Sequence, residues 1–467
     1  MARDIVRRDF IKRVGAAGAI GASGLAGCIG SPDGGGGGGG DSTGTETDSG
    51  GGDDGGMTET DSGGGSAEGP GGLVVIGYPE SGIQLFRDYY SASDGSEEIL
   101  VPDGLRDGAL PAQVGNDMAN ATGTAPAAGG PAQEAFTSAF ESEYDESPGV
   151  FTSQSYDSAA VQLLATAAAA ENAGAAVRDQ LRRVANPDGM EVTPDNFVDG
   201  IKAAANGEDV NHQRASSAVN FNDAGDPASA AYAIWEFAGT DEETTNTEEV
   251  QNFEGENPDG AGPAADSGPG GLGREIDIGI LLPETGNLAS VGQPMVQAAE
   301  LPVMEVNNAD VDLTVNAQVE DTETTPNAGS SAAERLVSAG VPSVCGTASS
   351  GVNVPVSESV FIPTEVVGCS PSSTALSVTN LEDNDFIVRT APSDILQGRV
   401  MAQVTAERLD ASSAVTLYVN NDYGQQLSER FASVFEESFD GEVFRQLGYN
   451  QGESSYTSVV QDALSPQ

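Results

Sequence analysis

Side chains able to carry out covalent chemistry are scarce in this chain of 467 residues. Serines are plentiful, but no Gly-x-Ser-x-Gly elbow stands between a predicted strand and a predicted helix, where a hydrolase would hold its nucleophile. His212 is the one histidine that could act as a base, and its Asn- and Asp-rich surroundings predict a surface residue. These residue types argue against a hydrolase, and we expect a protein that is not an enzyme.

The cysteines predict no metal site. Cys345 and Cys369 each end a predicted strand, and two cysteines with one histidine fall short of the four ligands of a structural zinc site. We therefore expect neither a metal nor a cofactor. Outside the reducing compartment a disulfide between Cys345 and Cys369 is permitted, and two buried free thiols are the equal alternative.

The chain carries 72 acidic and 19 basic residues, a formal net charge of -53, and its lysines are Lys12 and Lys202. Self-repulsion at that charge strains a compact fold in dilute buffer. Salt shrinks the screening length to about 3 Å at 1 M, which removes most of that strain. We interpret the composition as adaptation to high salt, with disorder as the alternative where apolar periodicity is absent. Nucleic acid is disfavoured as a partner, because phosphate binding needs Lys and Arg.

The N-terminus has the three parts of a secretory signal: basic residues, a weakly apolar run at residues 14–26, and small residues before Cys28. The run is too short for a bilayer span, which needs about 20 apolar residues. Arg-Arg-Asp-Phe-Ile-Lys at residues 7–12 resembles the twin-arginine export signal, and Leu-Ala-Gly-Cys at residues 25–28 resembles a lipobox. The resemblance implies a twin-arginine lipoprotein signal at residues 1–28 and a lipid on Cys28 that anchors the chain to the extracellular face of the cell membrane.

Two stretches have the composition of linkers. Glycine is unbroken from residue 34 to residue 40, and Gly, Ser, Thr and Asp dominate up to residue 71. No strand precedes this run and no helix follows it, so we expect a flexible tether at residues 29–71 rather than a phosphate-binding loop. Residues 257–274 are again rich in Gly, Pro and Asp and predict a second linker.

Outside the linkers, short apolar runs alternate with helical patterns. Strands are expected at residues 73–76, 98–101, 217–219, 232–235, 248–253, 276–282, 313–319, 341–345, 360–367, 414–419 and 443–448. Helices are expected at residues 133–144, 156–173, 425–439 and 456–464. The alternation predicts an α/β fold with mostly parallel sheets and helices on both faces. Such sheets bind ligands beyond the carboxyl ends of their strands.

Short segments of both halves carry a family resemblance. In the late half they are residues 276–286 (Ile-Asp-Ile-Gly-Ile-Leu-Leu-Pro-Glu-Thr-Gly), 321–326, 346–350, 370–374, 386–394, 397–398 and 422–424. In the early half they are residues 73–82, 102–104, 156–160 and 220–226. Together they resemble type I periplasmic solute-binding proteins of ABC transporters, in the branched-chain amino-acid-binding group. The resemblance implies two lobes, each a mostly parallel sheet flanked by helices, with a ligand cleft between them that closes by a hinge motion.

The order of these segments is unusual. Residues 275–467 resemble the family's N-terminal half and residues 72–256 its C-terminal half. We interpret the swapped order as a circular permutation whose new break falls in a helix-to-strand loop, where cutting is best tolerated. The linker at residues 257–274 then joins the old ends and spans about 25 Å. The alternatives are a rearranged gene whose halves do not pack, and halves that pair between chains in a swapped dimer.

The resemblance also implies which residues hold a ligand. By position in the family, Ser350 and Thr374 of the first lobe donate hydroxyl groups to the carboxylate of an amino acid, assisted by Ser349, Ser372 and Ser373. Ordinary loop serines are the alternative.

From the second lobe, Asp103 is expected to pair with the ligand ammonium, while Tyr423 and Tyr78 cover the ligand. Pro-Asp-Gly is also a strong turn sequence, so a turn aspartate is the alternative for Asp103. Val291 stands where the branched-chain binders carry an aromatic residue, which leaves amides, urea and other amino acids open as ligands.

The function implied by the resemblance is capture of a small amino-acid-like ligand for the permease subunits of an ABC importer. A ligand-sensing receptor domain of the same fold, a non-binding surface protein and a non-functional rearranged gene product are the alternatives.

The charge predicts a strong salt dependence of stability. We expect the melting temperature to rise as KCl increases from about 0.1 M to about 1 M, because screening weakens the repulsion between carboxylates. Thermal unfolding followed by circular dichroism measures it. Sucrose at matched osmolality is the control, because it stabilises by exclusion from the surface without screening charge. A melting temperature that is independent of KCl, or a rise that sucrose reproduces in full, contradicts the interpretation.

Overall fold

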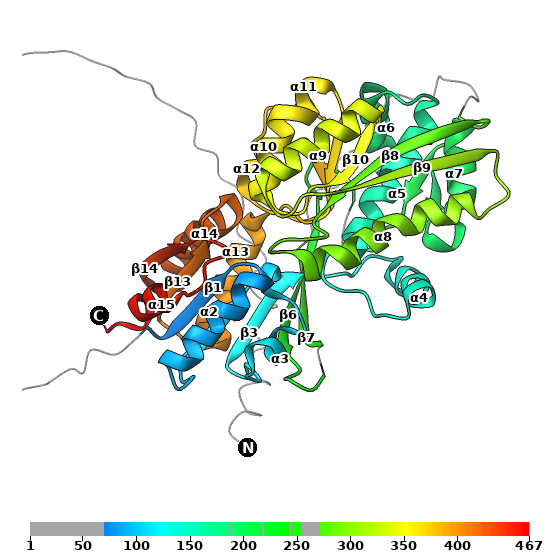
Figure 1. Cartoon of the computed structure of the whole chain (residues 1–467). Helices are drawn as coiled ribbons and strands as arrows, with labels where there is room; N and C mark the ends of the chain where they lie inside the picture. Colours follow the sequence, from blue (N-terminus) through cyan, green and yellow to red (C-terminus); the bar gives the residue numbers. More distant parts are fainter. Residues whose placement is uncertain (1–69, 186–188, 217–218, 243, 254–270, 467) are drawn as a thin grey trace, which may run out of the picture. The chain divides into compact units, whose positions relative to one another are not determined.

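The computed structural model describes residues 70–185, 189–216, 219–242, 244–253 and 271–466. The predicted signal with Cys28 lies outside these residues, as do nearly all of the predicted tether and linker. The described chain has two main sheets of mostly parallel strands, each flanked by helices, as Figure 1 shows. The predicted α/β fold class is confirmed. Among the described helices, none combines the length and apolar character that a bilayer span requires.

The first lobe is built on a five-stranded parallel sheet with the order β12-β11-β10-β8-β9. Its strands are β8 (Arg274–Leu282), β9 (Leu313–Asp321), β10 (Ser343–Gly346), β11 (Val367–Ser370) and β12 (Ile387–Arg389). Its helices are α4 (Gln133–Tyr144), α5 (Thr152–Ala169), α6 (Gly174–Ala185), α7 (Phe197–Ala205), α8 (Ala289–Asn307), α9 (Pro326–Ala339), α10 (Ser350–Val356), α11 (Ile362–Thr364) and α12 (Leu376–Thr379). A small parallel pair, β4 (Met190–Val192) and β5 (Val210–His212), lies beside α6 and α7.

The second lobe is built on a seven-stranded sheet with the order β14-β13-β1-β2-β3-β6-β7. Its strands are β1 (Gly72–Ile76), β2 (Glu98–Val101), β3 (Ala121–Pro126), β6 (Ala230–Phe237), β7 (Thr245–Phe253), β13 (Ser413–Val419) and β14 (Glu442–Tyr449). Its helices are α2 (Pro79–Ala92), α3 (Leu110–Val114), α13 (Asp394–Gln403), α14 (Asp422–Phe439) and α15 (Thr457–Leu464). Five strands are parallel, and β6 and β7 add an antiparallel edge.

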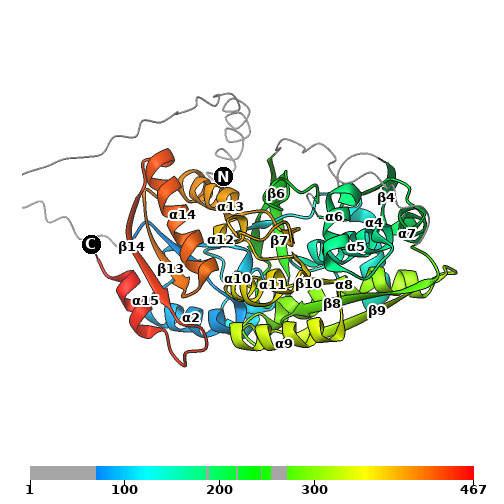
Figure 2. The same ribbon diagram turned by 90° about the horizontal axis from the view of Figure 1, so that it is seen from above.

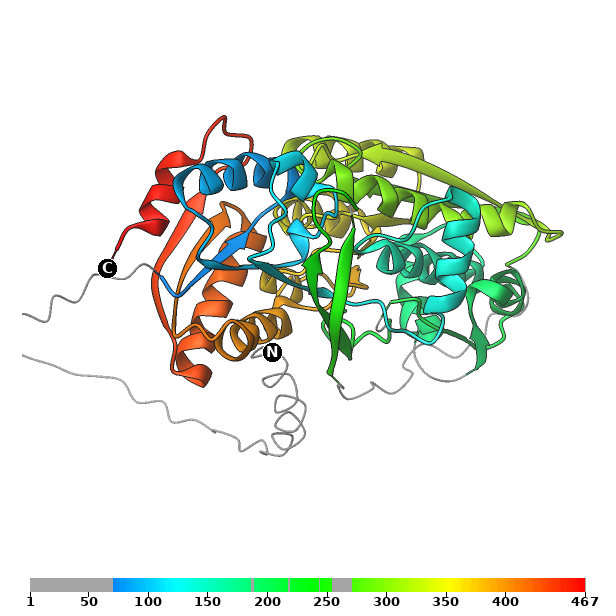
Figure 3. The ribbon, with the colours of Figure 1, turned by 90° about the horizontal axis from the view of Figure 1, so that it is seen from below.

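Both halves of the chain contribute to both lobes. The early half supplies α5 to the first lobe, where it packs against α8 and against β8, β10 and β11. The late half supplies β13, which pairs with β1 in the second lobe. Figure 2 shows β1 and α2, in blue, beside the orange and red elements of the late half. From below, α2 lies alongside α15 (Figure 3), where Asp88 accepts a hydrogen bond from the backbone N–H of Tyr456.

Among the described residues, three segments pass from one lobe to the other: residues 127–132, 213–216 together with 219–229, and 390–393. Each lies next to a strand of one of the main sheets, and we call this group of segments the hinge. It lies at the carboxyl ends of β3 and β12, next to the edge where ligands bind in parallel sheets.

The strand predicted at residues 360–367 is wrong over most of its length. Residues 357–361 form a π-helical turn and α11 continues to Thr364, so β11 starts only at Val367. Val352, Val356 and Val360 lie four residues apart and face one apolar cluster, so helical packing overrides the β-propensity of valine. Val219, also predicted in a strand, lies outside any strand.

Close packing at β3 depends on a glycine. Gly123 stands opposite Trp235 of β6, and a Cβ atom at residue 123 would come within 2.0 Å of the indole ring. Trp235 is fully buried, and the guanidinium carbon of Arg106 lies 5.5 Å from its ring centroid. The indole thus fills the space that a side chain on β3 would need.

Gly123→Ala is expected to lower the free energy of unfolding by about 1–3 kcal/mol, because the indole has to leave its place. Denaturant unfolding in concentrated KCl measures the change. The control is Gly149→Ala, where a new Cβ atom meets nothing within 4 Å, and no loss is expected. Equal stability of the two variants would contradict the packing argument.

Candidate functional site

A hollow lies where the carboxyl ends of strands from both lobes meet. Tyr78 follows β1 and Asp103 follows β2, while Ser349 and Ser350 follow β10. The lining residues are Tyr78, Asp103, Gly104, Phe151, Pro283, Leu288, Val291, Gly292, Met295, Ala348, Ser349, Ser350, Ser372 and Tyr423. Parallel strands bring their carboxyl ends to one edge, so residues far apart in sequence share this hollow.

The two lobes touch around the hollow. The hydroxyl groups of Tyr78 and Ser349 are hydrogen bonded at 2.8 Å, and the side-chain amide of Asn421 donates to the Tyr78 oxygen at 2.9 Å. Nearby, the Ser81 hydroxyl donates to Asn287 Oδ1 at 2.6 Å. Side chains of one lobe therefore bond directly to those of the other, as expected of a closed cleft.

Asp103 is the acid of this site. It is 3% exposed, and its Oδ1 accepts from Gln397 Nε2 at 2.5 Å and from the Tyr423 hydroxyl at 3.3 Å. Burial raises the pKa of Asp103 to about 7, although hydrogen bonds that favour the carboxylate act in the opposite direction. Asp103 also starts a 3-10 turn, Asp103–Leu105, so the turn expected from Pro-Asp-Gly is present too. Its side chain nevertheless faces the hollow, where it can pair with a cationic group.

Two tyrosines flank Asp103 in the hollow. The rings of Tyr78 and Tyr423 are stacked, with centroids 5.7 Å apart and planes 11° apart. Burial raises the pKa of Tyr78 to about 12, and it also holds the pKa of Tyr423 well above its ordinary value. Both phenols are therefore neutral and act through hydrogen bonds and apolar contact.

Hydroxyl groups form the opposite side. Ser349, Ser350 and Ser372 line the hollow, whereas Ser373 and Thr374 are buried just behind it. Ser373 donates to the backbone oxygens of residues 347 and 348, which ties its loop to β10. Of the eight residues expected to hold a ligand, the structure thus brings six to the hollow and two to its supporting layer.

An apolar wall completes the hollow. Phe151, Pro283, Leu288, Val291 and Met295 line it. Val291, which departs from the aromatic residue that the resemblance implies at this position, lies on α8 in this wall. A pocket with one apolar side, one hydroxyl side and one buried acid suits a small molecule that carries an anionic group, a cationic group and an apolar part.

The loop that carries Ser372 to Thr374 is held by a buried arginine that the sequence analysis did not single out. Arg389 is 0% exposed, and its Nη1 donates to the backbone oxygens of Ser373 at 2.9 Å and Ala375 at 3.0 Å. Its Nε donates to Asp226 Oδ1 at 2.7 Å. Asp226 comes from the early half of the chain and Arg389 from the late half, so the pair joins the halves beneath the site. Neither periodicity nor composition marks a buried arginine, although residues 386–394 carry part of the resemblance.

The expectation that His212 lies at the surface is wrong. His212 is 0% exposed, and its Nε2 lies 2.8 Å from Asp157 Oδ1. Asp157 belongs to helix α5, which is buried over residues 152–168, and its carboxylate also accepts from the backbone N–H groups of Ala215 and Ser216. A buried carboxylate requires such donors, and the polar stretch around His212 provides them. An aspartate inside an Ala-rich apolar helix was the sequence signal for this contact.

Cys345 and Cys369 occupy paired positions on β10 and β11, and both are buried free thiols. The structure therefore has the second of the two predicted alternatives and no disulfide between them. Neighbouring strands lie about 4.8 Å apart with side chains directed the same way, which is wider than the Cβ separation of most disulfides.

Comparison with known proteins gives matches to solute-binding proteins. A family model described as periplasmic binding protein matches residues 275–466. The Leu/Ile/Val-binding protein BraC3 of Rhizobium johnstonii is 28% identical over 194 residues, which are 41% of this chain and 48% of that protein. BasB of Halobacterium salinarum, a substrate-binding protein of a chemotactic signal transduction system, is 27% identical over 208 residues, 42% of this chain and 48% of that protein. The chain spans about half the length of the curated relatives it matches.

Among solved structures, LivJ of Streptococcus pneumoniae, in complex with isoleucine, is 25% identical, with a TM-score of 0.36, over 40% of this chain and 53% of that chain. The chain is thus similar over residues 275–466 to periplasmic binding proteins, and relatives include Leu/Ile/Val-binding proteins. These relatives bind solutes, which agrees with the expectation of a protein that is not an enzyme.

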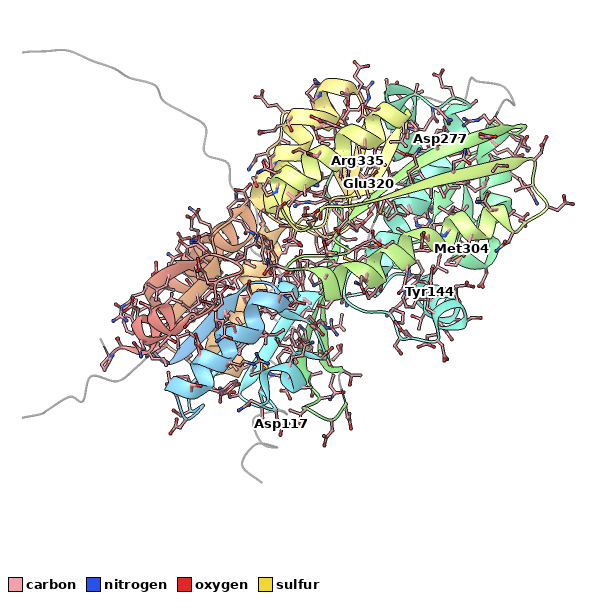
Figure 4. The ribbon with its side chains drawn as sticks, in the orientation of Figure 1. Asp117, Tyr144, Asp277, Met304, Glu320 and Arg335 are labelled. Carbon is pink, nitrogen blue, oxygen red and sulfur yellow. The ribbon has the colours of Figure 1, made fainter. Side chains whose placement is uncertain are left out.

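Arg389→Met is expected to lower the free energy of unfolding by about 3–5 kcal/mol, because it leaves Asp226 buried without its cation. Denaturant unfolding in concentrated KCl measures the loss. The control is Arg335→Met on α9, whose partner Glu320 lies beside it on β9 at 2.6 Å (Figure 4). Arg335 is 57% exposed, so no measurable change is expected. If both substitutions lowered the free energy of unfolding by the same amount, the buried pair would contribute no more to stability than the exposed pair.

Proposed function

We propose that this chain is a substrate-binding protein of an ABC importer that holds an amino acid or a related small ligand between its two lobes. The observation that carries the proposal is the shared hollow, in which hydroxyl groups of the first lobe face Asp103 of the second. Ligands that bridge two lobes in this way stabilise the closed form, which a permease can distinguish from the open form.

The ligand's three parts match the three sides of the hollow. Its carboxylate accepts hydrogen bonds from Ser350, from Thr374 and from backbone N–H groups of residues 372–374. Its ammonium pairs with Asp103, and Tyr78 and Tyr423 exclude water from that pair. Its side chain packs against the apolar wall that includes Val291 and Met295. The Leu/Ile/Val-binding proteins among the relatives are in line with an aliphatic side chain.

A ligand-sensing role is the second candidate. It is favoured by the similarity to BasB, whose name assigns it to chemotactic signal transduction. Genes for permease and ATPase subunits beside this gene support the importer, and a gene for a transducer supports the sensor. In both roles the ligand is captured at the same site.

We further propose export and lipid anchoring through Cys28, for which the twin-arginine and lipobox resemblances are the support. These residues lie outside the described part of the chain. Replacement of Cys28 would release such a protein from the membrane fraction.

We also propose that the halves run in swapped order relative to the similar proteins. If the late half came first, the elements would follow as β13, α14, β14, α15, β1, α2 and β2. That series is the unbroken β-α-β alternation from which parallel sheets are made. The pairing of β1 with both β13 and β2 supports the same order.

A thermal-shift screen of amino acids, amides and urea in concentrated KCl tests the proposed function. A ligand at 100 times its dissociation constant is expected to stabilise the protein by about 2.7 kcal/mol. Asp103→Asn should abolish the shift for amino acids, because the ammonium loses its charged partner. Asp107→Asn, four residues further along and only half-buried, is the matched control and should keep the shift. The absence of any shift across the screen, or an unchanged shift in Asp103→Asn, would refute the assignment.

A further inference from the structure

A second acid lies behind Asp103. Asp394 is the first residue of α13, at the hinge, and it is 0% exposed. Among the described residues, neither of its carboxyl oxygens has a hydrogen-bond partner of good geometry, and the neighbouring donor is the Thr374 hydroxyl, which favours the carboxylate. Gln397 lies one turn after Asp394 and donates to Asp103. The two acids thus share one buried region that supplies them with few donors.

The cation next to these acids is already engaged. Arg389 faces Asp394, but its guanidinium bonds to Asp226, to the Thr379 hydroxyl and to two backbone oxygens. Tyr232, Tyr78 and Tyr423 also face the acids. All three phenols are neutral, because burial raises the pKa of Tyr78 to about 12 and holds the pKa values of Tyr232 and Tyr423 well above their ordinary value. With Arg389 balanced by Asp226, no positive charge remains among these described neighbours for Asp103 and Asp394.

Two carboxylates in such a place cannot both ionise at low cost. A buried charge needs a partner, and a second negative charge nearby disfavours the first. Burial, followed by the charge of Asp103, holds the pKa of Asp394 well above its usual range. In the protein without ligand, the two acids therefore retain protons that exposed aspartates would have lost.

We propose that Asp103 and Asp394 form a two-acid site that selects ligands with a positively charged nitrogen and gives up a proton when such a ligand binds. The proposal rests on the proposed function and narrows it, because amides and urea lack the charge. In the binding step the O–H bond of one carboxylic acid breaks and its proton passes to water. The resulting carboxylate pairs with the ligand's ammonium, so the net charge of the buried site is unchanged.

Selectivity follows from this exchange. An amino acid delivers the charge that replaces the proton, so its affinity rises as the pH rises toward about 7, by about tenfold per pH unit where one proton is released. A neutral amide leaves both acids protonated and binds without proton release. Asp394 acts through Asp103, and we assign it as a positioning and charge-balancing residue.

Isothermal titration calorimetry with L-leucine and with acetamide tests the proposal in about 1 M KCl, at about pH 6, in two buffers of different ionisation enthalpy. The wild type is expected to release about one proton per L-leucine bound and none per acetamide. Asp394→Asn should retain both binding and proton release, because asparagine resembles the protonated acid and Asp103 still gives up its proton. Glu305→Gln is the matched control. Burial also raises the pKa of Glu305, to about 8, but Glu305 lies near the C-terminal end of α8 and its neighbouring acid is Asp195. It should leave the proton count unchanged.

L-leucine binding without proton release in the wild type overturns the proposal. Failure of both probes to bind the wild type would count against the proposed function with these ligands, and a ligand-free measurement separates the two ideas. Because its pKa is raised in the folded state, Asp394 contributes stability below about pH 4 that is lost as the pH rises through the folded value. The melting temperature of Asp394→Asn relative to wild type should therefore increase with pH. Parallel pH profiles would overturn the proposal without any ligand.

Discussion

The guanidinium of Arg389 connects parts of the molecule that the chain order keeps apart. It binds Asp226 from the early half, and it binds the backbone oxygens of Ser373 and Ala375 in the late half. A planar group with five donors can satisfy several buried acceptors at fixed angles, which a lysine cannot do. The loop beneath the hydroxyl side of the hollow is therefore held by a contact that exists only when the halves pack together. The shape of the hydroxyl side of the hollow and the packing of the halves therefore depend on the same buried pair.

Charge is distributed unevenly between surface and interior. The chain has 19 basic residues against 72 acidic ones, yet a fully buried arginine serves a structural pair beneath the site rather than the ligand. The hollow itself has acids and hydroxyl groups, and its phenols are neutral. Within the described part of the chain, the buried acids of this site have no free positive charge beside them. The ammonium group of an amino acid could supply that charge, whereas potassium ions in bulk salt reach the exposed carboxylates. We therefore interpret the acidic composition as a response to salt and the buried acids as part of the proposed ligand site, which are two different constraints.

Much of the fold could be predicted because the local signals are strong. The expected helix at residues 133–144 coincides with α4, and the strand at residues 98–101 coincides with β2. The prediction failed at residues 360–367, where valine favours a strand by propensity but packs on one face of a helix. It also failed at His212, where polar neighbours indicated a surface and the partner, Asp157, lies 55 residues earlier. Both errors concern long-range packing, which a local window of sequence does not contain.

The alternation of strands and helices, the acidic character and the residue types of the hollow could be predicted from the amino-acid order alone, because they depend on composition and short-range periodicity. The hydrogen bond between Tyr78 and Ser349, which are 271 residues apart, could not. Nor could the burial of Asp394 near Asp103, or the pairing of Arg389 with Asp226. Burial and pairing depend on which strands become neighbours in the folded sheets, and that arrangement is fixed by packing free energy over the whole chain rather than by any segment.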